Sequence, residues 1–366
     1  MARLLTPRFA LLTAAELSYF TAAGISVYAV PFYVTGPLHG SEAAAGLAFG
    51  AFAVSALLLR PVAGRLTDRL GRRPLFVGGA AGAALSFALT ALGPDLPALL
   101  ALRLLLGVAE AAFFVAAFAA LVDIAPPDRL GEALSFNSLG LYLGLAFGPP
   151  LGEVLAQRSF PAAWLAAAAL CVASGVVIAF VGETGAHAEQ RSTALIHRPA
   201  IGPGIALCAA VAASGGFLAF AALRAQETGM GNASLPLFLY GATVVVARVV
   251  FAKVPDRLPP LRLGALALAV IAAGLFLTPV SLLAGSVVLA LGVTFSTPAF
   301  FAAVFATAQP HQRGAASGTA SAFLDVGIGG GPILLGLVAT ISTSAALAAA
   351  GLVAVLGCLW TLRLRH

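Results

Sequence analysis

Charged side chains are scarce in this sequence. Only 9% of the 366 residues are charged, whereas about a quarter of the residues in a typical soluble domain carry a charge. Hydrophobic residues make up 60% of the chain, and its mean hydropathy is +1.01. Such a composition cannot supply a polar surface for a water-soluble protein of this length. Lipid is therefore the solvent for most of the chain, and we expect an all-α membrane protein.

Several kinds of chemistry also lack their sequence signals. The three cysteines (Cys171, Cys208 and Cys358) lie inside apolar runs without paired or metal-ligand spacing. The five histidines are scattered and none lies in the middle of an apolar run, which disfavours an intramembrane metalloprotease. No phosphate-binding loop of the Walker type is present, so direct coupling to ATP is not expected. We therefore predict neither a metal site nor a bound cofactor.

Apolar runs separated by charge, Pro or Gly clusters predict twelve membrane spans. They cover residues 9–34, 42–62, 73–93, 96–121, 132–156, 160–181, 200–222, 233–253, 261–278, 280–306, 315–340 and 342–362. The connectors are short except for residues 182–199, the one polar linker, which falls at the midpoint of the chain. We expect an N-terminal six-helix bundle (1–181), a cytoplasmic linker (182–199) and a C-terminal six-helix bundle (200–366).

The distribution of cations predicts the orientation in the membrane. With a cytoplasmic N-terminus, fifteen of the twenty Lys and Arg residues fall in cytoplasmic segments. Arg158 and Arg224 fall outside, and Arg60, Arg103 and Arg248 lie within spans. Because cytoplasmic loops of membrane proteins are enriched in Lys and Arg, both termini are predicted to be cytoplasmic. Topology thus explains the net charge of +6, and no nucleic-acid partner is expected.

The second half of the chain repeats landmarks of the first. The loop "GRLTDRLGRRP" (64–74) has a counterpart in "AKVPDRLPPLR" (252–262). A stretch from an Arg-Gly or Arg-Leu-Gly start to a Gly-Pro pair occurs at 128–152 and again at 311–336. Tandem six-helix halves with recurring landmarks in the same order are typical of transporters. We therefore expect two pseudo-symmetric bundles around a central cavity.

On these motifs the chain resembles the major facilitator superfamily (MFS) of transporters along its whole length. The loop signature G-x-L-x-D-R-x-G-R-R is met by Gly64, Leu66, Asp68, Arg69, Gly71, Arg72 and Arg73. A weaker R-x-x-x-G motif in the fourth span is met by Arg103 and Gly107. In the fifth span, a glycine run ending in G-P-x-x-G is met by Gly140, Gly144, Gly148, Pro149 and Gly152. The resemblance implies the twelve-helix MFS fold, and the last motif implies a proton-coupled antiporter that works as an exporter.

The charged loop between the second and third spans is predicted to act as a conformational gate. Asp68 can meet a helix N-terminus or an Arg, Gly64 permits close helix approach, and Asp123 is a plausible partner for Arg69 or Arg72. A purely topogenic role for the loop is the alternative. The predicted gate residues are Gly64, Asp68, Arg69, Gly71, Arg72, Arg73 and Asp123.

The glycines of the fifth span predict a hinge. Gly140, Gly144, Gly148 and Gly152 recur every four residues and form a small-residue stripe, which allows close helix approach in lipid. A proline inside a helix removes a backbone hydrogen bond and favours a bend. The run "GIGGGP" (327–332) in the eleventh span matches this pattern, and plain tight packing is the alternative. The predicted hinge residues are Gly144, Gly148, Pro149, Gly331 and Pro332.

Four charged residues lie within spans at positions where hydrocarbon would penalise a charge: Glu16, Arg103, Glu110 and Asp325. Each costs about 2.5–3.5 kcal/mol or more at the centre of a membrane helix unless it is paired or hydrated. We predict that the three carboxylates, Glu16, Glu110 and Asp325, couple transport to protons. A buried structural ion pair is the alternative for each charge, and Asp325 could instead hydrogen-bond a neighbouring helix without titrating. The predicted substrate-cavity residues are Arg103, Tyr19, Asn137, Tyr142 and Tyr240.

Together these features predict a secondary active transporter that works by alternating access. The expected activity is proton-coupled efflux of a small organic compound or drug, through a cavity between spans 1, 4, 5, 7, 8, 10 and 11. The expected partners are protons, the substrate and the lipid bilayer, and the proton gradient takes the place of a cofactor. We expect a monomeric multi-pass protein of the cytoplasmic (inner) membrane of a bacterium.

Two other functions stay open at this point. A facilitator or proton symporter of the same fold could import a small nutrient. A non-transporting membrane sensor or enzyme is an alternative of another class. The lack of a nucleophile–base pair within a span and of a water-soluble output domain argues against the latter.

Overall fold

The computed structural model describes residues 6–126, 129–184, 196–252, 254–255, 257–309 and 312–364, without the side chains of 130–132, 134–135 and 313–314. Residues 185–195 of the predicted linker lie outside this description. So do Lys253 and Asp256 of the second loop copy, and Arg3 among the cations used for the topology.

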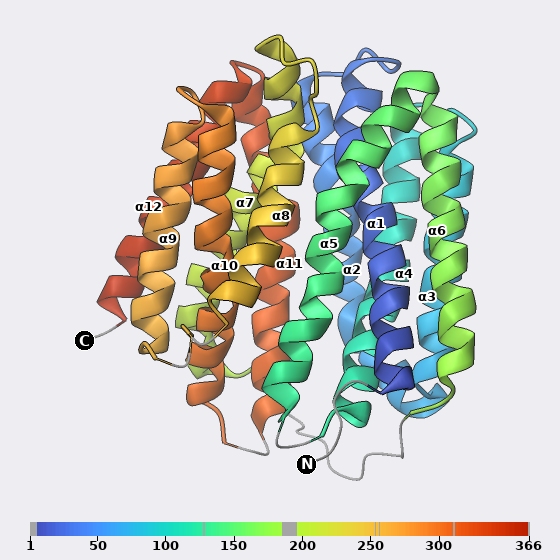
Figure 1. Ribbon diagram of the computed structural model, residues 1–366, viewed down its shortest axis with the longest axis vertical. Coiled ribbons are helices and arrows are strands. Elements are labelled where there is room, and N and C mark those ends of the chain that lie inside the picture. The colour runs from blue at the N-terminus through green and yellow to red at the C-terminus, as the bar shows by residue number, and fades with distance from the viewer. Residues whose placement is uncertain are drawn as a thin grey trace. The chain divides into compact units, whose positions relative to one another are not determined.

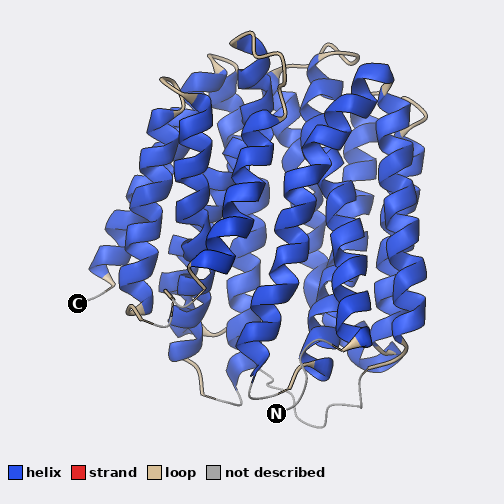
Figure 2. Cartoon of the chain, viewed as in Figure 1, coloured by secondary structure: helices blue, strands red, loops and turns tan. Residues whose placement is uncertain are grey.

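The described residues fold into α-helices and short 3-10 segments, without β-strands (Figure 2). The chain follows this order in Figure 1: α1 (Pro7–Thr35), α2 (Glu42–Leu70), α3 (Arg72–Thr90), α4 (Leu96–Ile124), α5 (Leu130–Arg158), α6 (Phe160–Val181), η2 (Arg198–Ala200), α7 (Ile201–Glu227), α8 (Leu235–Val250), α9 (Pro260–Leu277), α10 (Leu282–Ala306), α11 (Arg313–Ala339) and α12 (Thr343–Arg363). One α-helix therefore corresponds to each of the twelve predicted spans, which confirms the all-α fold.

Most of these helices can cross a membrane. Within the part of the chain that the structure describes, ten helices are long and apolar enough by length and composition. The other two are α3 and α8. α8 is apolar but has only 16 residues, fewer than the roughly 20 that a bilayer core requires.

Four even-numbered helices begin at a side-chain cap. Asp95, Ser159, Ser281 and Ser342 precede α4, α6, α10 and α12, and each side chain accepts a hydrogen bond from the backbone N–H three residues later. A capping oxygen satisfies one of the N–H groups that a helix start leaves without an internal partner. The sequence thus fixes where these four helices start.

The chain divides into two compact units. The first contains residues 1–33 and 54–189, and the second contains residues 34–53 and 190–366. The long helix α2 contributes to both, because its first part packs on α11 of the second unit: a methyl group added at Gly50 or Gly46 would collide with the carbonyl oxygen of Gly329 or Pro332. The predicted bundle boundaries at residues 181 and 200 stay a prediction.

In the first unit, α3 packs against α4 and α6. An aromatic cluster lies in its core, where the ring of Phe113 stacks on Tyr19 at 3.7 Å between centroids and meets Phe76 edge-on at 4.5 Å. Trp164 of α6 is fully buried beside Tyr33 and Phe87. These contacts fix α1, α3, α4 and α6 around one another.

In the second unit, α9 packs against α10, and α7 packs against α11 and α12. The α9–α10 pair is in close backbone contact, because a methyl group added at Gly292 would lie 2.7 Å from the carbonyl oxygen of Ala267. Small residues allow such close approach between helices in lipid.

Candidate functional site

Polar side chains are buried inside the apolar helices of the first unit. Glu16 of α1 is 5% exposed, Arg103 of α4 is 6% exposed, and Asn137 of α5 is 9% exposed. Buried polar groups are costly without hydrogen-bond partners, so the partners of these three side chains decide what they can do.

Glu16 and Asn137 form a direct hydrogen bond between α1 and α5. The Nδ2 atom of Asn137 donates to Oε2 of Glu16 at 2.6 Å. The hydroxyl of Thr13, three residues before Glu16, donates a longer bond of 3.5 Å to Oδ1 of the same amide. Glu16, predicted for proton coupling, is thus bonded to Asn137, predicted for the substrate cavity. Thr13, which was not predicted, is bonded to the same amide.

Arg103 binds the side chain of a neighbouring helix. Its Nη1 atom donates to the hydroxyl of Ser26 in α1 at 2.9 Å. Glu110, two turns further along α4, is half-buried and interacts electrostatically with Arg103 and with Tyr19. The two charged residues of α4 therefore belong to one electrostatic group in the first unit.

The predicted cavity tyrosines are buried. Tyr19 is stacked on Phe113, and Tyr142 of α5 is also buried in the first unit. Tyr240 of α8 lies in the second unit, where its ring is 5.6 Å from that of Phe217.

Asp325 of α11 also belongs to the second unit and is 2% exposed. The first unit therefore gathers Glu16, Tyr19, Arg103, Glu110, Asn137 and Tyr142, and the second contains Asp325 and Tyr240.

The charged loop forms an ion-pair network in the first unit. Nε of Arg72 lies 3.0 Å from Oδ2 of Asp123, at the end of α4, and Nη1 of Arg72 lies 3.8 Å from Oδ1 of Asp68. Arg72 is thus the arginine that pairs with Asp123. The side chains of Arg69 and Arg73 are exposed.

Glu183, which follows α6, is a member of this network that sequence reasoning missed. Its carboxylate accepts hydrogen bonds from the backbone N–H groups of Arg72 at 2.8 Å and Arg73 at 3.2 Å. These groups open α3, where a negative charge is favoured by the helix dipole. Gly71, with φ of 96°, turns the chain into this position. The signal was an acidic residue two positions after Val181, the last apolar residue of the sixth span.

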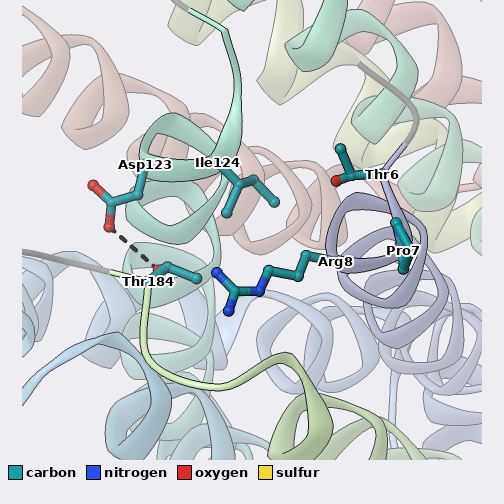
Figure 3. A pocket seen from close by; sticks show the side chains of 6 residues that line it. All are labelled: Thr6, Pro7, Arg8, Asp123, Ile124 and Thr184. Carbon is teal, nitrogen blue, oxygen red and sulfur yellow. Dashed lines mark hydrogen bonds between the residues drawn. The ribbon is translucent and has the colours of Figure 1, made fainter. Parts of the chain in front are cut away.

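A pocket of about 510 Å³ lies beside this network. Thr184 donates a 3.3 Å hydrogen bond to Asp123 at its wall, and the side chain of Arg8 extends from α1 toward Thr184 (Figure 3). Thr6, Pro7 and Ile124 complete the lining. The predicted gate loop, the ends of α1 and α4, and the segment after α6 therefore meet in one place.

Gly64 is predicted to permit close helix approach. A methyl group built on it would meet no atom of the described residues within 4 Å, so the contacts seen here do not use this glycine and its role stays a prediction. Gly71 is the loop glycine whose conformation and surroundings restrict a side chain. The role of the loop as a gate stays a prediction.

The glycines of α5 pack against α1 inside the first unit. A methyl group on Gly148 would lie 2.5 Å from the Cα atom of Gly24, and one on Gly144 would lie 2.5 Å from the carbonyl carbon of Phe20. In the second unit, a methyl group on Gly331 of α11 would lie 2.5 Å from the carbonyl oxygen of Ala212 in α7. The matching glycine runs thus make matching helix contacts, α5 with α1 and α11 with α7. Pro149 and Pro332 lie inside continuous helices, and the hinge stays a prediction.

Comparison with known proteins agrees with this architecture. Residues 11–282 match the family model of the Major Facilitator Superfamily. An uncharacterized MFS-type transporter of Salmonella typhimurium is 29% identical over 345 residues, covering 89% of this chain and 88% of its own length. One from Burkholderia mallei is 28% identical over 325 residues, covering 85% and 80%.

Solved transporter structures share the fold. The human organic anion transporter MFSD10 (TETRAN) superposes with a TM-score of 0.75 at 19% identity, covering 97% of this chain and all of that one. A bacterial homolog of the human lysosomal transporter Spinster, in an inward-facing and occupied conformation, gives 0.77 at 16% identity, covering 97% and 95%.

The multi-pass helical fold and the charged residues buried in its helices are features that membrane transporters share. The family match covers most of the chain, and the protein belongs to the Major Facilitator Superfamily. This is a family of transporters and not a class of enzymes.

Proposed function

We propose that this MFS transporter exports a small organic compound across the cytoplasmic membrane in exchange for protons. The observation that carries the proposal is the buried pair of Glu16 and Asn137, because a carboxylate held inside a membrane helix is costly and marks an ion or substrate pathway. The polar group formed by Arg103, Glu110 and Tyr19 supports the same assignment.

The proposed cycle uses Glu16, Glu110 and Asp325 as proton carriers. A proton that arrives from the outside neutralises a carboxylate, which weakens substrate binding and favours return to the inward-open state. Release of the proton to the cytoplasm restores the charge and allows the next substrate to bind. Arg103, Tyr19, Asn137, Tyr142 and Tyr240 are the proposed lining of the substrate cavity.

The proposed gate and hinge couple this chemistry to conformation. The pairing of Arg72 with Asp123, together with the Glu183 cap, supports a role for the loop in stabilising one state of the cycle. We propose α5 and α11 as the elements that move, because both combine a glycine run in close contact with a neighbouring helix with an internal proline. We propose that the chain works as a monomer in a bacterial inner membrane with both termini in the cytoplasm. We also propose that the proton gradient drives transport and that no cofactor is used.

The substrate charge is left open by these residues. The carboxylates suit a cationic or zwitterionic amphiphile, whereas Arg103 suits an anion. The test therefore uses inverted membrane vesicles with an acidic lumen, a fluorescent pH-gradient dye and a panel of cationic, zwitterionic and anionic compounds.

A proton antiporter dissipates the gradient when its substrate is added, and the dye signal recovers. Vesicles that carry Glu16→Gln should show no recovery with the same compound. Transport that is identical with and without the gradient would indicate a facilitator. The absence of transport for the whole panel would favour a non-transporting sensor.

A further inference from the structure

The side-chain amide of Asn137 can form a hydrogen bond with Glu16 in both the ionised and the protonated state of the carboxyl group. We propose that Asn137, in the lining of the proposed cavity, is a positioning residue for the proton carrier and is held in turn by Thr13. This inference rests on the proposed function, since it assigns a partner to the carboxylate that the proposed cycle protonates.

The observed arrangement suits an ionised Glu16. An ionised carboxylate only accepts hydrogen bonds, so the amide must turn its NH₂ group to Glu16. This is the orientation found, with Nδ2 donating to Oε2 at 2.6 Å. The carbonyl oxygen Oδ1 then faces Thr13, whose hydroxyl can donate to it.

The same three residues can satisfy a protonated Glu16 by rotating one amide. A carboxylic acid donates its O–H, and after a half-turn of the side-chain amide, Oδ1 faces Glu16 and accepts it. The NH₂ group then faces Thr13, whose hydroxyl oxygen has lone pairs to accept with. In each state the Asn137 amide can stay paired with both Glu16 and Thr13, so a change of protonation does not leave the amide unsatisfied.

The position of the pair suits this role. Glu16 and Asn137 are both buried, and they lie on α1 and α5, the two helices whose glycines Gly24, Gly144 and Gly148 are in close backbone contact. Rotation of a side-chain amide needs little space, so it can occur between two helices whose backbones are in close contact. Tyr19, one turn along α1 from Glu16, interacts electrostatically with Arg60 of α2, Arg103 and Glu110 of α4, and Cys171 of α6.

The test follows the protonation of Glu16 without any substrate. The purified full-length protein in lipid is titrated while its infrared difference spectrum is recorded, and the carbonyl stretch of a protonated carboxylic acid that disappears in Glu16→Gln is assigned to Glu16. In Asn137→Leu, whose side chain has the same branched shape but no polar atoms, we expect this pH-dependent signal to be lost. Ser18→Ala is the matched control, because Ser18 also bonds across helices, to the Leu170 carbonyl, and should keep the signal.

Each outcome decides the proposal. A wild-type signal in Asn137→Leu, or no Glu16 signal in the wild-type protein, overturns it. If Asn137→Leu does not fold, the double variant Glu16→Gln/Asn137→Leu should fold, since no buried carboxylate then lacks its amide; failure of both makes Asn137 a packing residue. Export by the vesicle assay is measured separately, so a lost infrared signal with intact gradient-driven export would leave the proposed function standing without this inference.

Discussion

At the scale of single residues, Glu110 of α4 combines a position inside a membrane helix with electrostatic contact to Arg103 and Tyr19. We predict that Glu110→Gln lowers gradient-driven export much more than it lowers the amount of protein in the membrane, because the amide keeps the shape but cannot carry a proton. Initial export rates normalised to expression check this, with Glu42→Gln at the start of α2 as the control. An unchanged normalised rate in Glu110→Gln would remove this residue from the coupling mechanism.

Asp325 offers the corresponding test in the second unit. It is almost completely buried in α11, and desolvation makes the charged form of a buried carboxylate costly. We predict that Asp325→Asn inserts into the membrane and can still bind substrate but loses exchange driven by the proton gradient. Substrate binding and exchange are measured on the same preparation. The same pH-dependent exchange as in the wild-type protein would make Asp325 a structural hydrogen-bonding residue.

At the scale of helices, the adjacent glycines Gly330 and Gly331 of α11 differ in how closely another helix packs against them. A methyl group at Gly331 collides with the backbone of α7 at Ala212, whereas one at Gly330 meets none of the described atoms within 4 Å. Forcing extra volume into a packed contact costs about 1–3 kcal/mol. Gly331→Ala should therefore lower the thermal stability of the purified protein. Gly330→Ala should leave stability unchanged or raise it, because Ala is the better helix former. Equal effects of both changes would contradict the close α7–α11 contact.

The loop glycines give a second matched pair. Gly71 has a φ of 96°, and a side chain there would also meet the Glu183 carboxylate at 2.5 Å. Holding a residue other than Gly in such a region costs on the order of 1–3 kcal/mol. We predict that Gly71→Ala destabilises the protein and that Gly64→Ala, which enters open space, does not. Thermal denaturation in detergent measures both, and a neutral Gly71→Ala would show that the Glu183 cap is dispensable.

Helix existence was predictable from the sequence because it depends on apolar length, and each of the twelve predicted spans contains a helix. Helix partners were less predictable. The pairing of Arg72 with Asp123 was among the expected choices, since both residues stand at the same end of neighbouring spans. The Glu183 cap was missed because it depends on where the chain turns after α6, and the Glu16–Asn137 bond was missed because it depends on the rotation of α1 against α5.

At the scale of the whole molecule, the fold and family are those of a transporter, and α2 contributes to both compact units. The first part of α2 is in close contact with α11 at Gly46 and Gly50, so a larger side chain at either glycine should lower stability.

The most direct test of proton-coupled export uses the purified protein in sealed liposomes with a compound identified in the vesicle screen. A proton gradient is imposed with the lumen acidic, and the movement of the compound and of protons is followed together. We expect the compound to accumulate in the lumen against its own gradient while protons leave, and we expect no accumulation when an ionophore collapses the gradient. Accumulation that persists after collapse, or movement of compound and protons in the same direction, would contradict antiport.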